Sequence, residues 1–214
     1  MKKTDSKDER VESAPPHGPG ARLSPASEGK GPLLQRDYWA VFEDSPLRPR
    51  ALIDAVAERF CEFPPEELVR FEPVAPGVAS GCLLVGEDLA IRIRGAGECG
   101  VRVVHRDENS FTLLTLEGHP EAGRITFGAY PNDEGDVVFH IRSRARASSS
   151  LRYVEFLALG DAMQTNTWAD FINNVAATIG CAPEEIHADT IEVEESEADT
   201  IEKHDQPTFL ARGD

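Results

Sequence analysis

Six strand-like runs follow one another between residues 81 and 146, and one long helical run comes directly after them. In these runs β-branched and aromatic residues alternate with polar ones, and turn-forming residues separate several of the runs. Consecutive strands joined by short turns pair as antiparallel hairpins. The chain is therefore expected to contain one antiparallel sheet built from the runs 81–86, 89–94, 100–106, 110–117, 124–130 and 136–146.

The sequence on either side of these runs predicts one more strand and three helices. Residues 38–42 are aromatic and β-branched, as in a strand, and Pro49 is placed to open a short helix. A second short helix is expected at 65–69. Apolar residues recur at helical spacing over 151–179, and Gly180 is suited to end that helix. The predicted fold class is α+β, with about seven antiparallel strands, two short helices after the first strand and a long C-terminal helix.

The two ends of the chain differ from its middle in composition. Residues 1–31 are polar and rich in Pro, Gly and Ser, and residues 181–214 carry eleven acidic residues against two basic ones. Neither end has enough apolar side chains to offset the conformational entropy that ordering removes. We therefore expect a disordered arm at 1–31, a folded domain at 32–180 and a disordered acidic tail at 181–214.

Charge and cysteine content limit the partners and the location that we expect. The formal net charge of −16 makes nucleic acid and anionic membranes poor partners. No apolar run approaches the roughly 18 residues of a membrane helix, and the N-terminus lacks the apolar core of a secretory signal. The four cysteines have no C-x-x-C spacing, so we expect no metal site. A cytoplasmic location with reduced thiols follows as the expectation.

Residues 95–100 match the pattern G-x-G-x-x-G directly after a strand-like run. This pattern binds a dinucleotide where a helix follows, because the amides at the helix N-terminus bind the pyrophosphate. Here residues 101–105 alternate like a strand. The glycines are therefore interpreted as a hairpin turn, and no cofactor is expected.

The segment with the most distinctive residues is Thr115-Leu116-Glu117-Gly118-His119-Pro120-Glu121-Ala122-Gly123, a His-Pro turn between two strand-like runs. It resembles the T-L-x-G-H-P-E-x-G signature of an uncharacterised conserved family, a "domain of unknown function" group with bacterial and plant members. That family is related to the helix-grip (START-like, polyketide-cyclase-like) fold. Its pattern continues with acidic residues, whereas Arg124 follows here. The resemblance covers about residues 37–179 and implies a curved sheet wrapped around the last helix, with a largely apolar pocket between them.

The pocket that this resemblance implies gives the first functional hypothesis, binding or carriage of a small hydrophobic molecule. A few polar groups in an apolar concavity suit a ligand. Aromatic residues at helical spacing suit plain core packing equally. The side chains expected to line the pocket are Trp39, Met163, Gln164, Thr167 and Trp168.

A second hypothesis is a cyclase- or hydrolase-like enzyme. His119 lies close in sequence to Glu117 and Glu121, and a His beside a carboxylate can transfer protons near neutral pH. A purely structural turn explains the same residues, because the position before Pro is extended and the glycines permit sharp bends. We find no nucleophile near the motif in sequence.

Basic residues recur along three of the predicted strands and alternate there with apolar ones, so they are expected to share the face opposite the core. One interpretation is an ordinary solvated face. The other is an anion-binding surface for an acidic ligand or for the protein's own tail. A third functional hypothesis is accordingly a protein-interaction module acting through the acidic tail. The basic residues are Arg92, Arg94, Arg102, His140, Arg142 and Arg144.

Overall fold

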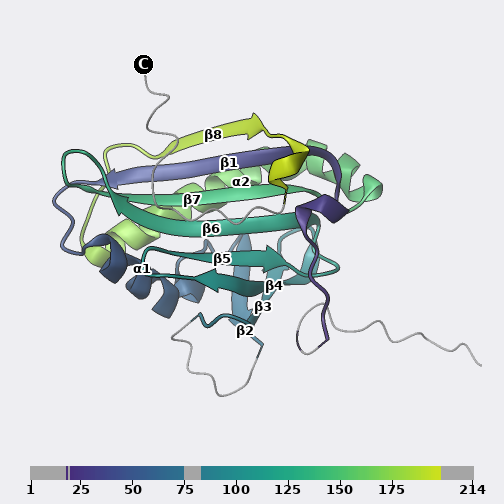
Figure 1. The fold of residues 1–214 in the computed structure, drawn as a ribbon, viewed down its shortest axis with the longest axis horizontal. Helices are drawn as coiled ribbons and strands as arrows, with labels where there is room; N and C mark the ends of the chain where they lie inside the picture. Colours follow the sequence, from purple (N-terminus) through teal and green to yellow (C-terminus); the bar gives the residue numbers. More distant parts are fainter. Residues whose placement is uncertain (1–17, 19, 75–82, 199–214) are drawn as a thin grey trace, which may run out of the picture.

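An antiparallel sheet is the centre of the fold. The structure, a computed structural model, describes residues 18, 20–74 and 83–198, with side chains in the long helix described from Gln164 onward. Within these residues eight strands pair in the order β2-β3-β4-β5-β6-β7-β1-β8 (Figure 1). The strands are β1 (Lys30–Phe42), β2 (Val69–Pro73), β3 (Asp88–Ile93), β4 (Gly97–Arg106), β5 (Ser110–Thr115), β6 (Glu121–Pro131), β7 (Val137–Ala147) and β8 (His187–Glu192).

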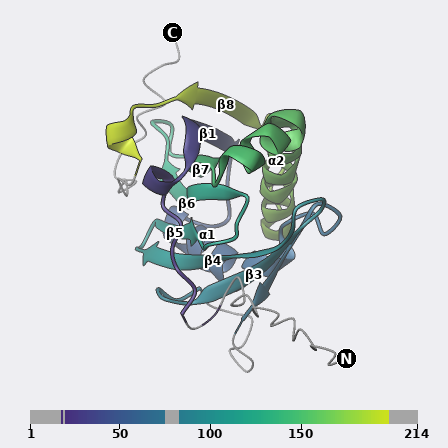
Figure 2. The ribbon, with the colours of Figure 1, turned by 90° about the vertical axis from the view of Figure 1, so that its right-hand side faces the viewer.

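Helices cover one face of this sheet. These are α1 (Pro49–Glu58) and the long α2 (Ser150–Ile179), which ends where Gly180 adopts a φ of +80°. Short 3-10 turns occur at η1 (Ala26–Glu28), η2 (Phe60–Glu62) and η3 (Glu195–Glu197). The face opposite α2, called the outer face below, carries η1 and η3 (Figure 2). Among the described residues, no helix is both long and apolar enough to cross a membrane.

An aromatic core fills the space between the sheet and the second half of α2. The Phe60 ring lies 5.2 Å from Phe127 and 5.6 Å from Phe171 of α2, and Phe111 stacks on Phe127 at 4.9 Å. All four rings are buried. Trp168 adds an edge-to-face contact with Phe127 at 5.6 Å. The ring contacts show that this end of the core is filled by side chains. Burial of such large side chains is a main source of stability.

The strands β3 to β7, together with α1 and α2, lie where the sequence predicts them. Two differences concern the neighbourhood of β2. The helix expected at 65–69 is a single turn, in which the amides of Leu68 and Val69 both bond to the Pro65 carbonyl. Val69 then begins β2, because its side chain and that of Phe71 alternate into the core. The strand expected at 81–86 is absent from its described residues, 83–86.

The described parts of the two chain ends are ordered on the sheet, where the sequence predicted disorder. Residues 20–29 run along the sheet, and the Ser24 amide bonds to the Thr115 carbonyl at 2.8 Å. Near the other end, β8 pairs with β1 and makes the sheet eight-stranded rather than about seven-stranded. Backbone hydrogen bonds make these contacts, so polar side chains do not prevent them. The remainder of both predicted ends, residues 1–17, 19 and 199–214, lies outside the described residues.

The glycine-rich segment 95–100 is a hairpin, as predicted. Gly95 and Gly97 have φ values of +84° and +87°, and the Ala96 amide closes the turn on the Ile93 carbonyl at 3.1 Å. The residues that follow continue as β4. This segment therefore has no helix N-terminus that could receive a phosphate.

Candidate functional site

On the side of the sheet that faces the helices, the size of the side chains changes along α2. Since β7 ends at Ala147 and α2 begins at Ser150, the last residues of β7 lie near the first half of the helix. Phe139, at the other end of β7, stacks on Phe171 in the second half. Between these limits, large aromatic side chains give way to small ones. The small residues on this face are Gly123, Ser143, Ala145 and Ala147.

Three polar side chains lie among these small residues and are called the helix-side cluster: Arg36, Glu121 and Ser143. Arg36 of β1 shares the face of Tyr38 and is the register partner of Ser143 of β7. Its Nη1 lies 3.6 Å from Oε1 of Glu121, and only 1% of the Arg36 side chain is exposed. The cluster thus places a buried ion pair and a hydroxyl on the side of the sheet that faces α2.

Ser143 is the member whose bonding is incomplete. The residue is 6% exposed, and within the described part of the structure its Oγ has no hydrogen-bond partner. Buried hydroxyls are normally bonded, because a lost hydrogen bond in the interior costs about 1–3 kcal/mol. A polar group of a bound molecule would remove that cost.

The His-Pro turn is held together by its own signature residues. The buried Nδ1 of His119 accepts the backbone N–H of Glu121 at 3.0 Å. Burial lowers the pKa of His119 to about 4, so the imidazole is neutral at pH 7. Glu117 is exposed and lies 3.7 Å from Arg22, whereas the Glu121 carboxylate points to Arg36. The structure therefore gives His119 a structural contact with the backbone and directs both candidate carboxylates to arginines.

The predicted pocket residues do not all lie on one side of the sheet. Trp39 lies on the outer face, where it stacks on His187 of β8 at 5.0 Å. Because Tyr38 points into the core, its neighbour Trp39 must point the opposite way. Trp168 and the buried Thr167 belong to the helix side, and Gln164 is half-buried on α2. The side chain of Met163 lies outside the described residues.

Of the helix-side cluster, only Glu121 is among the site residues predicted from the sequence. A signal for Arg36 was present, since it stands two residues before Tyr38 and therefore shares its face. Its charge, however, favours the outer face of the sheet, and residue type and alternation therefore point to opposite faces for Arg36. Ser143 follows the same rule, because it stands two residues after the core residue Ile141.

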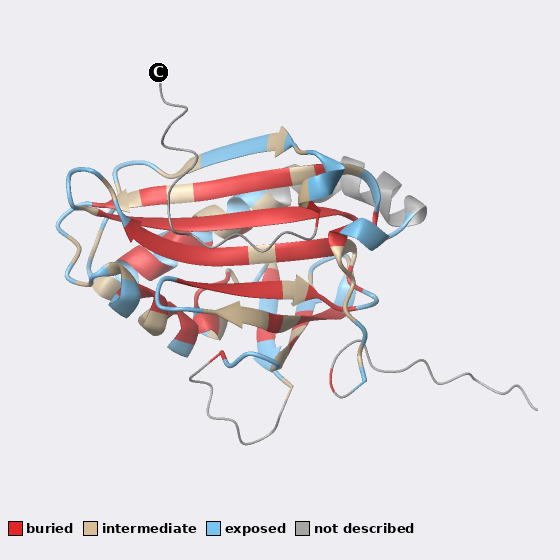
Figure 3. Cartoon of the chain, in the orientation of Figure 1, coloured by how far each residue is buried: buried red, intermediate tan, exposed pale blue. Residues whose placement is uncertain are grey.

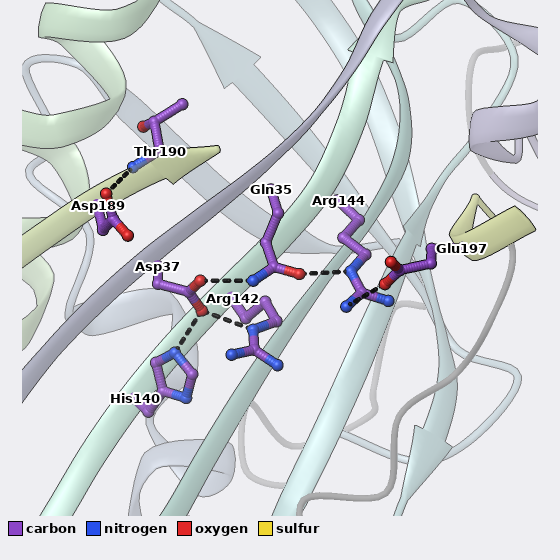
Figure 4. Close-up of polar contacts among 8 residues, drawn as sticks. All are labelled: Gln35, Asp37, His140, Arg142, Arg144, Asp189, Thr190 and Glu197. Atoms are coloured by element: carbon purple, nitrogen blue, oxygen red, sulfur yellow. Dashed lines mark hydrogen bonds and ion pairs between the residues drawn. The ribbon is translucent and has the colours of Figure 1, made fainter. Parts of the chain in front are cut away.

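A second polar network occupies the outer face (Figure 4). Asp37 accepts hydrogen bonds from Arg142 at 2.6 Å and Gln35 at 2.7 Å, and its Oδ1 lies 2.7 Å from Nε2 of His140. Arg144 donates to Gln35 at 2.7 Å. Burial acts to raise the pKa of Asp37, but His140 and Arg142 outweigh it and lower that pKa to about 2. Asp37 is thus a carboxylate throughout the physiological range.

Burial divides the basic row into two parts. His140 is 0% exposed and Arg142 and Arg144 are buried, so this part of the row is not a solvated face. Figure 3 shows β6 and β7 mostly buried along their length, in contrast to the exposed β8. Arg92, on β3, is exposed and pairs with Glu98 at 2.6 Å.

Other features of the described residues offer weaker sites. A hollow of about 380 Å³ is lined by residues of α2 and of the η2 region. Its charged side chains, Arg59 and Glu62, are exposed and pair with each other at 2.6 Å. Among the residues that the structure describes, no three His, Cys, Asp or Glu side chains come close enough to hold a metal ion. The helix-side cluster is therefore the candidate site for a small molecule.

Comparison with known protein families places the sequence. The family model described as "Domain of unknown function (DUF1990)" matches residues 51–172, more than half of the chain and a stretch that includes the His-Pro turn. The chain belongs to the DUF1990 family. This DUF1990 match agrees with the domain-of-unknown-function resemblance predicted from the sequence. No curated protein matches the sequence.

Solved structures resemble this DUF1990 protein in fold. A norcoclaurine synthase point mutant from Thalictrum flavum matches with a TM-score of 0.51 and 11% identity, covering 70% of this chain and 96% of the other. Major latex-like protein 151 from Panax ginseng matches at 0.45 and 13%, covering 69% and 98%. Protein Ms6760 from Mycobacterium smegmatis matches at 0.45 and 14%, covering 67% and 89%. The synthase match, at 11% identity, shows a likeness of fold.

Proposed function

We propose that this DUF1990 protein binds a small hydrophobic molecule between the sheet and the first half of α2, and that the helix-side cluster recognises one polar group of that molecule. The observation that carries the proposal is the buried Oγ of Ser143, which has no hydrogen-bond partner within the described residues. A ligand oxygen or nitrogen bonded to this hydroxyl would satisfy it.

The chemistry of the surroundings supports a ligand that is mostly apolar. Ala145 and Ala147 offer hydrocarbon surface without filling much volume, and a curved sheet around a long helix would enclose the remaining space. Arg36 beside Glu121 adds one charged pair, which suits a hydroxyl, carbonyl or carboxylate on the ligand. The norcoclaurine synthase structure is a complex with a transition-state analogue, so a protein of this fold binds a small molecule.

Native mass spectrometry of the freshly purified full chain tests the proposal. We expect a bound small molecule on the wild-type protein and its loss from Ala145→Leu, because the larger side chain would fill the space beside Ser143. The Ser143→Ala variant should carry a smaller bound fraction of the molecule than the wild type. Thr126→Val is the matched control, since Thr126 bonds to Thr112 on the outer face.

The outcome is read from the bound fraction at equal protein concentration, with circular dichroism as the check of folding. Equal retention by Ala145→Leu and wild type would place any ligand elsewhere. Loss from Thr126→Val alone would also contradict the proposed position.

A further inference from the structure

Four arginines lie side by side on the outer face and are called the arginine face: Arg124, Arg142, Arg144 and Arg146. The last three alternate along β7, and Arg124 of β6 is the register partner of Arg144. Each is less than a tenth exposed. Like charges directly opposite each other in a sheet are destabilising, so this surface requires anionic partners.

Two side chains of β1 contact arginines of this surface. Asp37 of β1 bonds to Arg142 at 2.6 Å, and Gln35 of the same strand accepts a bond from Arg144 at 2.7 Å. An amide oxygen carries no net charge. Arg124, Arg144 and Arg146 are also contacted by the segment that follows β8.

Residues 193–198, called the acidic strap, make these contacts. Glu195 bonds to Arg146 at 2.5 Å, and Glu197 pairs with Arg144 at 2.9 Å. Arg124 donates to the backbone carbonyls of Glu197, at 3.2 Å, and Ala198. The strap therefore presents two carboxylates in alternate positions together with main-chain carbonyls, which is the chemistry of an acidic peptide.

The strap is held mainly by groups that remain in water. The side chains of Glu195 and Glu197 are 69% and 42% exposed, whereas those of their partners Arg146 and Arg144 are 9% and 6% exposed. The strap's apolar anchor is small, consisting of Val193 and Ala198 against Leu33 and Ala26. The arginines, in contrast, are buried in the rigid sheet. The strands therefore fix the positions of the arginines, whereas the strap adds carboxylates that another acidic segment could supply in its place.

We propose that the arginine face is a docking site for an acidic peptide segment of another protein, with the acidic strap as its internal competitor. A peptide fits better than a free phosphate because Arg124 bonds to main-chain carbonyls as well as lying beside the carboxylate sites. The site is on the opposite face of the sheet from the proposed small-molecule site, so the two proposals stand or fall separately.

Fluorescence polarisation with a labelled peptide of residues 193–198 tests this proposal on the full chain. In the wild type the strap competes at the high effective concentration of a tethered segment, so binding should be weak. The variant Glu195→Gln/Glu197→Gln removes only the strap's carboxylates from the arginine face and should bind the peptide at least about 10-fold more tightly. Adding Arg146→Gln should reverse most of that gain. The matched control is Arg92→Gln, which makes the same charge change at an exposed arginine on β3.

Four results would overturn the proposal. The first is no peptide binding by the Glu195→Gln/Glu197→Gln variant at millimolar concentration. The second is an equal effect of Arg146→Gln and Arg92→Gln, which would make the response one of net charge. The third is full competition by inorganic phosphate, which would identify a simple anion site. The fourth is a fall of more than about 5 °C in the melting temperature of the Glu195→Gln/Glu197→Gln variant, which would make the strap a structural part of the fold.

Discussion

Thr115 and Gly123 are joined across the His-Pro turn, because the Thr115 hydroxyl accepts the Gly123 N–H at 3.0 Å while it donates to the Ser24 carbonyl at 2.7 Å. The first and last residues of the signature thus meet, and the N-terminal segment is fastened to the same point. This contact explains the spacing of the signature without assigning it any catalytic role.

Gly123→Ala is expected to destabilise the protein by about 2–4 kcal/mol. A Cβ at this position would come within 2.3 Å of the Arg144 carbonyl oxygen, and the φ of +150° is itself unfavourable for other residues. Gly135→Ala is the control, since its φ is +94° but nothing lies within 4 Å of the added carbon. Urea denaturation of both variants measures the difference. Equal losses would show that backbone strain, and not the contact with β7, governs Gly123.

Titration of His119 should make stability depend on pH between about 4 and 6.5. Because burial lowers the folded-state pKa of His119 from 6.5 to about 4, the unfolded chain binds a proton in this window and the folded chain does not. The contribution is complete above pH 6.5 and is lost as the pH falls towards 4. We expect up to about 3 kcal/mol from this residue.

His119→Asn checks that assignment, since Asn retains an acceptor close to Nδ1 but does not titrate. The free energy of unfolding of the variant should change less between pH 7 and pH 5 than that of the wild type. Asp37 does not confound the comparison, because its carboxyl contributes stability that is lost only as the pH falls from 3.8 towards its folded pKa of about 2. Parallel pH profiles for variant and wild type would contradict the buried, neutral state of His119.

The two tryptophans allow a matched test of which side of the sheet binds the small molecule. Trp168→Ala should reduce ligand retention in native mass spectrometry, because Trp168 packs on Phe127, whose register partner Ile141 stands two residues before Ser143 on the same face. Trp39→Ala should leave retention unchanged, because Trp39 stacks on His187 on the outer face. Trp168→Ala also removes core contacts worth about 3 kcal/mol or more, so folding must be verified for each variant.

A comparison with His119→Ala separates binding from catalysis. Since the imidazole bonds to the turn backbone, its removal should leave ligand affinity nearly unchanged in protein that remains folded. An enzyme using His119 as acid or base would instead lose about 10²–10⁴-fold in turnover at unchanged affinity. Such a loss, measured as conversion of the co-purified molecule, would contradict simple carriage.

Asp37→Asn should cost about 3–5 kcal/mol, the usual loss when one partner of a buried ion pair is removed. Arg142 would then lie in the interior without the carboxylate that it contacts at 2.6 Å. Asp189, the register partner of Asp37 on β8, is exposed and provides the control. Thermal denaturation should show a change within about 0.5 kcal/mol for Asp189→Asn. Similar losses for the two variants would mean that the outer-face network contributes little.

The central strands and both α-helices could be predicted because their side chains carry the pattern. Helical spacing in α1 reflects burial of one face, and alternation in β7 separates apolar side chains that face the helices from polar ones on the outer face. The edge strands β2 and β8 were not predicted, since β8 has mostly exposed side chains and is held by backbone bonds to β1. Such bonds are available to any residue except Pro and leave little trace in the sequence.

The candidate site was less predictable than the fold. Trp39 is predicted to line the pocket, whereas alternation with the core residue Tyr38 puts it on the outer face. Residue type does not predict Arg36 in the site, since charged residues are rarely found in a protein interior. The pairing of Arg36 with Glu121 joins residues far apart in sequence, and only the order β6-β7-β1 brings them together.

The position of β8 also decides how the sheet meets other copies of itself. Without β8, the thirteen-residue strand β1 would form an edge whose free amides and carbonyls could template pairing with a neighbouring molecule. β8 replaces that long edge with a six-residue one whose side chains are mostly exposed and include Asp189 and Glu192. Short, charged edges resist aggregation, because each added strand would bring like charges together. The acidity of this segment therefore protects the protein against self-association, in addition to any role in recognition.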